Sequence, residues 1–439
     1  MIAWSPMRRR GFFYPVLILV AVNVLNFYDR QVPGALAEPV RKEFHLTDAQ
    51  LGLLGSAFIW LYAIVGLPLG RLADRWSRKK LLAGGMGVWS LLTAYAALAT
   101  SFGMLIFSRL GVAVGEAVAA PTATSWIGDL FPVQQRARAL SLFMLGVPVG
   151  SALSFFFSGP IAQAYGWRAA MVTAALPALL LIPLLLTLPE PYRGASETGP
   201  QEPAAASFWS VLRIPTLWWI IASGALLNFN MYAIGTFLPA FFSRIHGSSL
   251  ARSGIQTGII YLVGGVTGGV LAGIWGDRIV HRRQDGRMLS AAAITFLAAP
   301  FSYIGIVLRP GSEWLVMGSL AVAYAALNGY YGLVYSSIQD IVPPAQRGTA
   351  MALYFMLMYL CGASMGPLLT GALSDAMAHR AAEAAGSVVV TEAFKAVGLQ
   401  QAMLIIPVLS VGLALVLWVG SRTILKDLVH KSIAVPAAG

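Results

Sequence analysis

Long apolar stretches, each separated from the next by a short polar segment, follow one another along the whole chain. Each holds about 20 residues, which is enough for a helix to cross a hydrocarbon core of ~30 Å. Twelve such stretches lie at residues 13–38, 48–70, 82–99, 102–126, 138–160, 168–188, 214–243, 252–275, 288–307, 313–338, 348–372 and 400–421. The pattern predicts an all-α integral membrane protein with twelve transmembrane helices.

The composition agrees with this prediction. Hydrophobic residues make up 57% of the chain and charged residues 11%, whereas soluble proteins carry about 25% charged residues. The first stretch has no small-residue cleavage site and contains Asp29 and Arg30, so we interpret it as a retained helix rather than a signal peptide. Cys361, the single cysteine, lies in the eleventh stretch and is expected to be a small buried hydrophobe. The histidines show no metal-ligand spacing, so we expect no metal site.

The basic residues are unevenly distributed. Of the 30 Lys and Arg, twenty lie in the N-terminal segment, the even-numbered loops and the C-terminal segment, and eight lie in the odd-numbered loops. By the positive-inside rule this predicts that both termini are cytoplasmic. Topology and anionic lipid headgroups then account for the net charge of +12, so we expect no nucleic-acid partner. In a bacterium the protein is expected in the plasma (inner) membrane.

A segment rich in Pro, Gly, Ala and Ser, residues 189–213, follows the sixth stretch, and we interpret it as a cytoplasmic linker. It separates residues 1–188 from residues 214–439, and each part holds six stretches. Short motifs recur in the two halves: residues 70–75 (GRLADR) match residues 273–278 (GIWGDR), and residues 129–136 match residues 340–347. Two pseudo-symmetric six-helix bundles are expected, an arrangement that resembles the major facilitator fold.

The loop after the second stretch reads GRLADRWSRKK and resembles the hallmark of the major facilitator superfamily. In that superfamily the acid of this motif binds a neighbouring helix end and latches one conformation. The resemblance assigns the latch to Asp74, Arg75 and Arg78, and to Asp277 and Arg278 in the degenerate second copy. The alternative is a plain basic loop. The chain has no P-loop, no G-x-S-x-G motif after a strand and no Cys/His cluster, so we do not expect an enzyme.

Two pairs of charges lie inside apolar stretches: Asp29 with Arg30, and Arg109 with Glu116. Such charges cost at least ~2.5–3.5 kcal/mol near the bilayer centre, so they indicate a functional site. Asn26, Asp29 and Arg30 share one helix face. Burial favours a protonated acid and a nearby cation favours the carboxylate. We therefore interpret the two acids as proton-coupling groups and the two arginines as charge partners or headgroup ligands. A permanent salt bridge between the helices is the structural alternative.

The second half offers neutral polar groups instead of charges. Its seventh, eighth, tenth and eleventh stretches carry no Lys, Arg, Asp or Glu in their cores. Their aromatic and amide side chains either pack or line a substrate cavity. The candidate cavity residues are Asn26 and Tyr62 of the first half and, of the second half, Asn228, Tyr232, Tyr261, Asn328, Tyr331, Tyr335 and Tyr354. A cavity with one charged and one aromatic wall fits an amphiphile with an ionic head and an apolar tail.

Residues 26–30 (NFYDR) resemble the N-Y-x-D-R motif of the spinster family of major facilitator transporters. Arg109 and residues 115–117 (GEA), followed by residues 129–131 (DLF), 135–138 (QRAR) and 148–151 (PVGS), resemble the fourth and fifth helices of that family. Spinster proteins are associated with export of lysophospholipids and sphingolipid phosphates, and proton coupling is proposed for some. The resemblance implies that Asp29 and Glu116 are the protonatable acids, with Arg30 and Arg109 as their partners.

Other transporter classes share parts of these motifs. Organic anion–proton symporters also carry a D-R pair in the first helix and an acid in the fourth, and they take up sugar acids or aromatic acids. The spacing of Gly146, Gly150 and Gly159-Pro160 is a partial version of a drug-exporter motif. A receptor or scaffold is disfavoured, because it would need a large soluble domain or a long tail. We expect a monomer that works by alternating access, with protons as the coupling ion and no other cofactor.

Overall fold

The computed structural model describes residues 9–73, 75–131, 133–193, 211–280, 282–342 and 346–434. Within these ranges the chain forms helices joined by short turns, and no strand is present. Helices occupy all twelve stretches that the sequence singles out. The all-α prediction is therefore confirmed.

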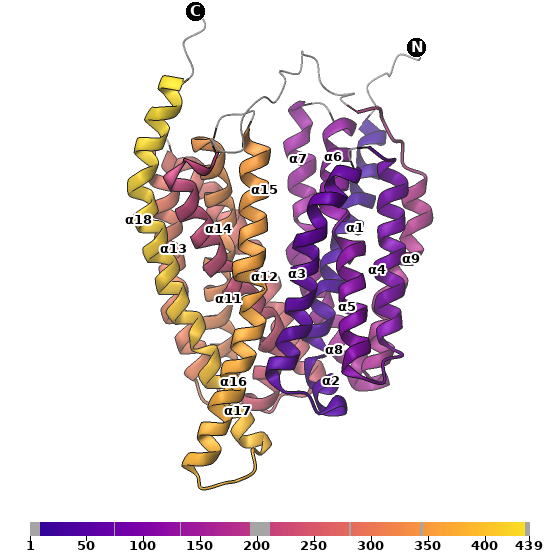
Figure 1. Ribbon diagram of the computed structural model, residues 1–439, viewed down its shortest axis with the longest axis vertical. Coiled ribbons are helices and arrows are strands. Elements are labelled where there is room, and N and C mark those ends of the chain that lie inside the picture. The colour runs from indigo at the N-terminus through magenta and orange to yellow at the C-terminus, as the bar shows by residue number, and fades with distance from the viewer. Residues whose placement is uncertain are drawn as a thin grey trace, which may run out of the picture. The chain divides into compact units, whose positions relative to one another are not determined.

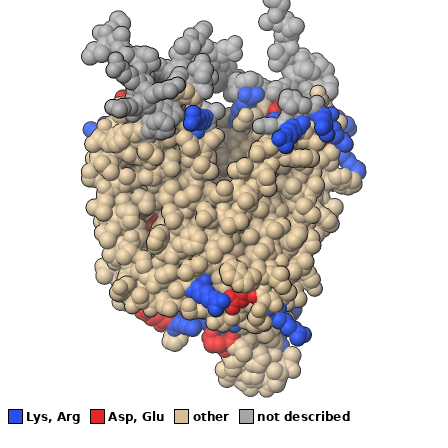
Figure 2. Space-filling view, turned by 180° about the vertical axis from the view of Figure 1, so that it is seen from behind, with Lys and Arg blue, Asp and Glu red and all other residues tan. Residues whose placement is uncertain are grey.

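Nine helical segments of the described chain are long and apolar enough to cross a membrane. The other three predicted stretches lie in α1 (Arg9–Ala35), α4 (Arg78–Ala96) and α14 (Glu313–Ile341). The surface in Figure 2 agrees with membrane insertion. Charged side chains gather at the upper and lower margins of the view, and the wide band between them is almost entirely uncharged. Such a band is suited to contact with hydrocarbon.

The chain forms two compact units, and the first contains Met1–Leu36 and Leu61–Pro200. Here α1 packs along α8, while α4 packs on α5 and α9 (Figure 1). Besides α1 and α4, the unit holds the C-terminal part of α3 (Asp48–Ala73), α5 (Phe102–Glu116), α6 (Ala119–Leu130), α7 (Val133–Met144), α8 (Gly146–Tyr165) and α9 (Trp167–Leu186).

The second unit contains Ala37–Trp60 and Gln201–Gly439. Helix α14 packs against both α12 and α13, and α18 packs on α13 and α11. Besides α14, the unit holds α2 (Ala37–Phe44), the N-terminal part of α3, α11 (Pro215–His246), α12 (Leu250–Val280), α13 (Gly286–Val307), α15 (Arg347–Met358), the π-helix η2 (Tyr359–Ala363), α16 (Met365–Ala384), α17 (Glu392–Met403) and α18 (Ile405–Ala434).

Residues 37–60 precede most of the first unit in sequence but group with the second unit. The expected division into residues 1–188, a linker at 189–213 and residues 214–439 stays a prediction. Residues 194–210, most of that linker, lie outside the described residues.

The structure corrects one sequence expectation in the second unit. Cys361 lies in η2, between α15 and α16, and it is exposed rather than buried. A thiol behaves as a small hydrophobe with only a weak donor, so an apolar environment outside the bundle suits it as well as the interior does.

Close helix contacts in the first unit depend on glycine. A Cβ atom at Gly115 would lie 2.7 Å from the backbone nitrogen of Trp89 and 2.8 Å from the carbonyl oxygen of Gly85. Both distances are shorter than packed carbon atoms allow, so α5 approaches α4 this closely because position 115 has no side chain. Gly115 is the residue before Glu116 on α5, and Trp89 lies one helical turn before Thr93 on α4.

Candidate functional site

The four charges inside the predicted spans of the first unit come together, and their pairing is crossed between helices. Arg30 Nε of α1 donates to Glu116 Oε2 of α5 at 2.7 Å. Arg109 Nη1 of α5 lies 3.9 Å from Asp29 Oδ2 of α1. Neighbours in the sequence, Asp29 and Arg30, therefore pair with different residues of the same facing helix. All four side chains are at least nine-tenths buried.

The two acids of this core cluster are bonded differently. Thr93 Oγ1 of α4 donates to Asp29 Oδ2 at 2.9 Å, whereas Glu116 Oε1 finds no donor among the described residues. The negative charges of Asp29 and Glu116 also repel each other. Uptake of a proton by one of the two acids removes this repulsion. The geometry is therefore suited to holding and releasing a proton.

Each acid lies beside a proline that interrupts the helical hydrogen bonds. Pro33 has no N–H for the carbonyl of Asp29, four residues earlier, and Pro121 has none for the carbonyl of Ala117. Helix α5 ends at Glu116 and α6 begins at Ala119. The helical hydrogen-bond pattern is thus incomplete within five residues of each acid in the sequence.

Aromatic rings fix the position of Arg30. Its guanidinium lies 4.3 Å from the ring centroid of Tyr62 and 4.9 Å from that of Phe27. Both distances fall within the range of cation–π attraction. Asn26, one turn before Arg30 on α1, is buried, and its Nδ2 has no partner within the described ranges. The structure thus places Tyr62 against the core cluster.

The predicted latch residues are only partly brought together. Asp74 lies outside the described residues, as does the side chain of Asp277. Arg75 and Arg278 are exposed. Arg78, by contrast, is almost fully buried at the start of α4.

Arg78 joins several elements of the first unit. Its Nη1 donates to Asp129 Oδ2 at 2.5 Å, and its Nη2 donates to the carbonyl oxygen of Pro191 at 2.6 Å. Glu190 accepts from the backbone N–H of Arg78 and from the Ser77 hydroxyl, both at 2.5 Å. The segment that follows α9 is thereby fastened to the start of α4.

An equivalent pair occurs in the second unit, where Arg287 Nη1 donates to Asp340 Oδ2 at 2.6 Å. Asp129 and Asp340 are 211 residues apart and Arg78 and Arg287 are 209 apart, close to the repeat offset. The internal repeat therefore carries an Arg–Asp pair that the sequence analysis did not identify.

The neutral candidates of the second unit form a hydrogen-bonded aromatic cluster. Tyr331 donates to Asn228 Oδ1 at 3.0 Å, and the rings of Tyr331 and Tyr335 lie 5.5 Å apart. Tyr335 packs edge-on against Tyr354 at 5.5 Å. Tyr232 packs edge-on against Tyr359, at 6.4 Å.

Two further candidates are placed by other contacts in the same unit. Tyr261 packs on Tyr324 with ring centroids 4.3 Å apart, and Asn328 Nδ2 donates to the carbonyl oxygen of Gly265 at 2.6 Å. Phe355, which packs on both Tyr335 and Tyr354, and Tyr330, whose hydroxyl group hydrogen-bonds Ser223 at 2.7 Å, also belong to this region. Phe355 was not considered from the sequence, because nothing in the pattern separates it from a packing residue.

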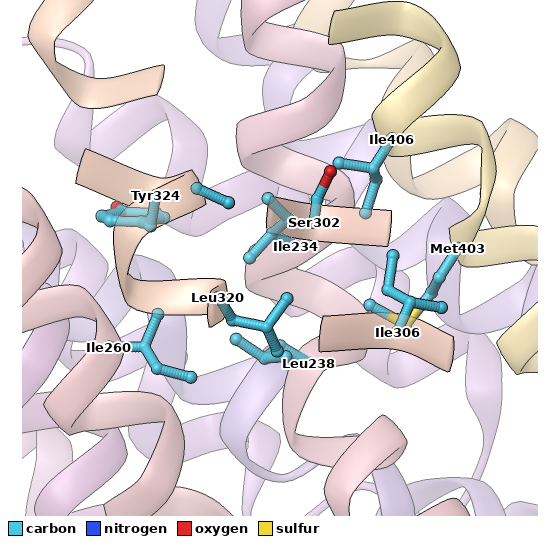
Figure 3. A pocket seen from close by; sticks show the side chains of 10 residues that line it. Ile234, Leu238, Ile260, Ser302, Ile306, Leu320, Tyr324, Met403 and Ile406 are labelled. Carbon is cyan, nitrogen blue, oxygen red and sulfur yellow. The ribbon is translucent and has the colours of Figure 1, made fainter. Parts of the chain in front are cut away.

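A small pocket lies inside the second unit (Figure 3). The centre of a water molecule can occupy about 20 Å³ of this pocket. That is room for about one water molecule and far less than a lipid needs. Its lining is mostly aliphatic and comes from Ile234, Leu238, Ile260, Ser302, Ile306, Leu320, Ala323, Tyr324, Met403 and Ile406. We interpret it as a packing void of the bundle rather than as a transport cavity.

A second group of charges, which we call the α2–α3 network, fastens residues 37–60 to the rest of the second unit. Arg244 of α11 donates to both oxygens of Asp48, each at 2.8 Å, and to Glu38 at 2.5 Å. The Ser374 hydroxyl also donates to Asp48, at 2.6 Å. All three charged side chains are at least nine-tenths buried.

Arg41 and Asp375 complete the α2–α3 network. Arg41 Nη2 lies 3.1 Å from Glu38 and 2.6 Å from Glu392 of α17. Asp375 of α16 accepts from the backbone N–H groups of Asp48 and Ala49 at 3.0 and 2.9 Å, so it caps the start of α3. From the sequence, Arg41 and Arg244 counted only as basic residues of odd-numbered loops, and the acids of this network were not singled out.

The comparisons with known proteins agree with one another. Residues 19–367 match the Major Facilitator Superfamily. An MFS-type efflux pump of Mycolicibacterium smegmatis is 31% identical over 366 residues, 82% of this chain and 84% of that protein. Protein spinster homolog 1 of Bos taurus is 29% identical over 382 residues, 82% of this chain and 72% of that protein.

A solved structure supports the same assignment over nearly the whole chain. The crystal structure of a bacterial homologue of the human lysosomal transporter spinster, in an inward-facing and unoccupied conformation, matches with a TM-score of 0.85 and 28% identity. The match covers 96% of this chain and 99% of that one. The chain therefore belongs to the Major Facilitator Superfamily, and it is an integral membrane transporter of the spinster type rather than an enzyme.

Proposed function

We propose that this protein couples proton movement to the transport of an amphiphilic anionic or zwitterionic molecule, such as a lysophospholipid or a sphingolipid-like molecule, by alternating access. The observation that carries the proposal is the core cluster of Asp29, Arg30, Arg109 and Glu116. Two acids and two arginines are buried there within predicted spans, and each acid pairs with an arginine of the facing helix. Protonation of an acid removes its attraction for the facing arginine, which frees that arginine for an anionic headgroup.

The difference between the two units supports the substrate class. The first unit offers charged groups, and the second offers tyrosines, a phenylalanine and amides with no charge in the cluster. An ionic headgroup is complementary to the former and an apolar tail to the latter. A sugar has no long apolar tail and would use only part of this aromatic surface.

Two other substrate classes are possible outcomes of the transport experiment described below. An exporter of drug-like molecules is favoured by one observation, the likeness to the mycobacterial efflux pump. A sugar-acid or aromatic-acid symporter would use the same buried acids and arginines.

The membrane setting is also proposed. The excess of Lys and Arg in the even-numbered loops supports cytoplasmic termini and insertion in the plasma membrane. We propose a monomer, with protons as the coupling ion.

The test is transport by purified protein in proteoliposomes under an imposed pH gradient. Labelled lysophospholipid, a labelled sugar acid and a fluorescent dye are compared for the wild type, Asp29→Asn, Glu116→Gln and the double variant. We expect the gradient to drive lysophospholipid movement in the wild type, and we expect the double variant to lose it. The matched control is Glu383→Gln, which neutralises an exposed acid on α16.

Movement of the sugar acid alone would indicate that this protein is an anion symporter that uses the same buried acids. Movement of the dye alone would favour an exporter. Gradient-driven transport that persists in the double variant would contradict the coupling role of both acids.

A further inference from the structure

The hydroxyl group of Thr93 is directed at an acid of another helix. Thr93 is almost fully buried on α4, and its Oγ1 donates to Asp29 Oδ2 of α1 at 2.9 Å. The same carboxylate oxygen is the one closest to Arg109, at 3.9 Å. Thr93 is therefore nearer to Asp29 than its arginine partner is.

Several other buried hydroxyl groups of this protein are bonded within their own helix. Thr257, Thr295 and Ser410 each donate to the carbonyl oxygen four residues earlier in their own helix, at 2.7–2.8 Å. Such bonds satisfy the hydroxyl group locally. The hydrogen bond that the structure shows for Thr93 instead crosses to α1, so its geometry is set by the acid.

We propose that Thr93 is a positioning residue that sets the proton affinity of Asp29. A hydroxyl group donates to a carboxylate and accepts from a protonated acid. Thr93 therefore keeps contact with Asp29 in both protonation states, but its O–H favours the charged one. It holds Asp29 in place after proton uptake, when the attraction to Arg109 is lost. Only the effect of Thr93 on transport rests on the proposed proton coupling.

The other groups that act on Asp29 are few. Arg109 and Glu116 face it from α5, and Arg30 and Tyr28 flank it on α1. Helix α8, which packs along α1, contains no Asp, Glu, Lys, Arg or His. Thr93 is the group that α4 contributes to this acid, so removing its hydroxyl group changes one interaction and leaves the charges untouched.

The experiment compares Thr93→Val, Thr93→Ser and Ser90→Ala with the wild type. Valine keeps the shape and removes the hydroxyl group, whereas serine keeps the hydroxyl group. Ser90 is one turn earlier on α4 and fully buried, and its hydroxyl group has no partner in the described part of the chain, so Ser90→Ala is the matched control. Two quantities are measured across pH: transport in proteoliposomes, and the infrared carbonyl band of protonated carboxyl groups in the purified protein. The band of Asp29 is identified as the one lost in Asp29→Asn.

We expect Thr93→Val to move the midpoint of the Asp29 band upward by about one pH unit, a tenfold change in proton affinity. Transport is expected to shift with it, while Thr93→Ser and Ser90→Ala stay at the wild-type midpoint. An unchanged band midpoint in Thr93→Val overturns the proposal, even if transport is slower. It is also overturned if Asp29→Asn removes no titrating band. If the band shifts but a pH gradient drives no transport, the proposed function fails and the role of Thr93 stands.

Discussion

Both compact units bury acids against arginines, but they satisfy these charges to different degrees. In the α2–α3 network each oxygen of Asp48 and Glu38 accepts at least one hydrogen bond from an arginine. In the core cluster one ion pair measures 2.7 Å and the other 3.9 Å, and Glu116 Oε1 finds no donor within the described ranges.

This difference indicates different roles. A buried network whose charges are all bonded is rigid and costly to break, whereas a cluster with a spare acceptor can take up a proton. The α2–α3 network therefore suits a structural fastening, and the core cluster suits a group that changes its charge. Variants in the two regions should separate stability from transport.

The largest expected effect on stability is that of Arg244→Met. It leaves Glu38 and Asp48 buried without their main partner, which costs about 3–5 kcal/mol. We expect the apparent Tm in detergent to fall by roughly 5 °C. Arg252→Met is the control, because Arg252 also pairs with an acid, Glu313, but is 63% exposed. Equal effects of the two variants would remove the distinction between buried and exposed pairs.

Arg41→Met should cost less, about 2 kcal/mol, because its partner Glu392 is 60% exposed and its buried partner Glu38 keeps the hydrogen bond from Arg244. Burial lowers the pKa of Arg41, but the hydrogen bond to Glu392 and the charge of Glu38 outweigh burial and raise it above its ordinary value. A raised pKa of a base gives stabilisation that is fully present below the unfolded-state value of about 12.5. The difference in Tm between variant and wild type should therefore be the same at pH 6 and pH 9. A difference that changes between these pH values would contradict the assignment.

Glu116→Gln is expected to cost only about 1 kcal/mol, since the amide oxygen still accepts from Arg30. Its consequence for gradient-driven transport should be far greater than its consequence for Tm. Thermal unfolding and transport are measured on the same preparation. A loss of stability as large as that of Arg244→Met would mean that the core cluster is a structural salt bridge after all.

The smallest effect is expected at the edge of the network. Lys395 pairs with Glu392 at 3.0 Å, and both side chains are at least one-third exposed. Lys395→Gln should change stability by less than about 0.5 kcal/mol, and high salt should abolish even that difference. A clear drop in Tm at high salt would show that the network extends to this residue.

The apolar stretches predicted the helices well because a hydrocarbon environment selects for length and apolarity, which the sequence displays directly. The interruptions were harder to predict. Pro121 follows the break between α5 and α6 and accounts for it once the structure is known. Pro33, by contrast, lies inside α1, which is a single continuous helix. Whether a proline ends a helix depends on the neighbours that satisfy the freed carbonyl group.

The sequence identified the four core charges because charges inside apolar stretches are rare. It did not predict their crossed pairing, because periodicity gives the face of a helix and not the helix that faces it. Thr93 carried no signal, since a threonine in an apolar helix is common. Arg244 and Asp48 resembled ordinary loop charges. Arg287 could have been found, because it lies at nearly the repeat offset from Arg78.

The crossed pairing also has a consequence for how this sequence can change over time. Arg30 is bonded to Glu116, 86 residues away, and not to its neighbour Asp29. A substitution at position 30 is therefore tolerated only with a matching change on a different helix. Across related chains, positions 30 and 116 should vary together, as should positions 29 and 109, while the adjacent positions 29 and 30 should vary independently.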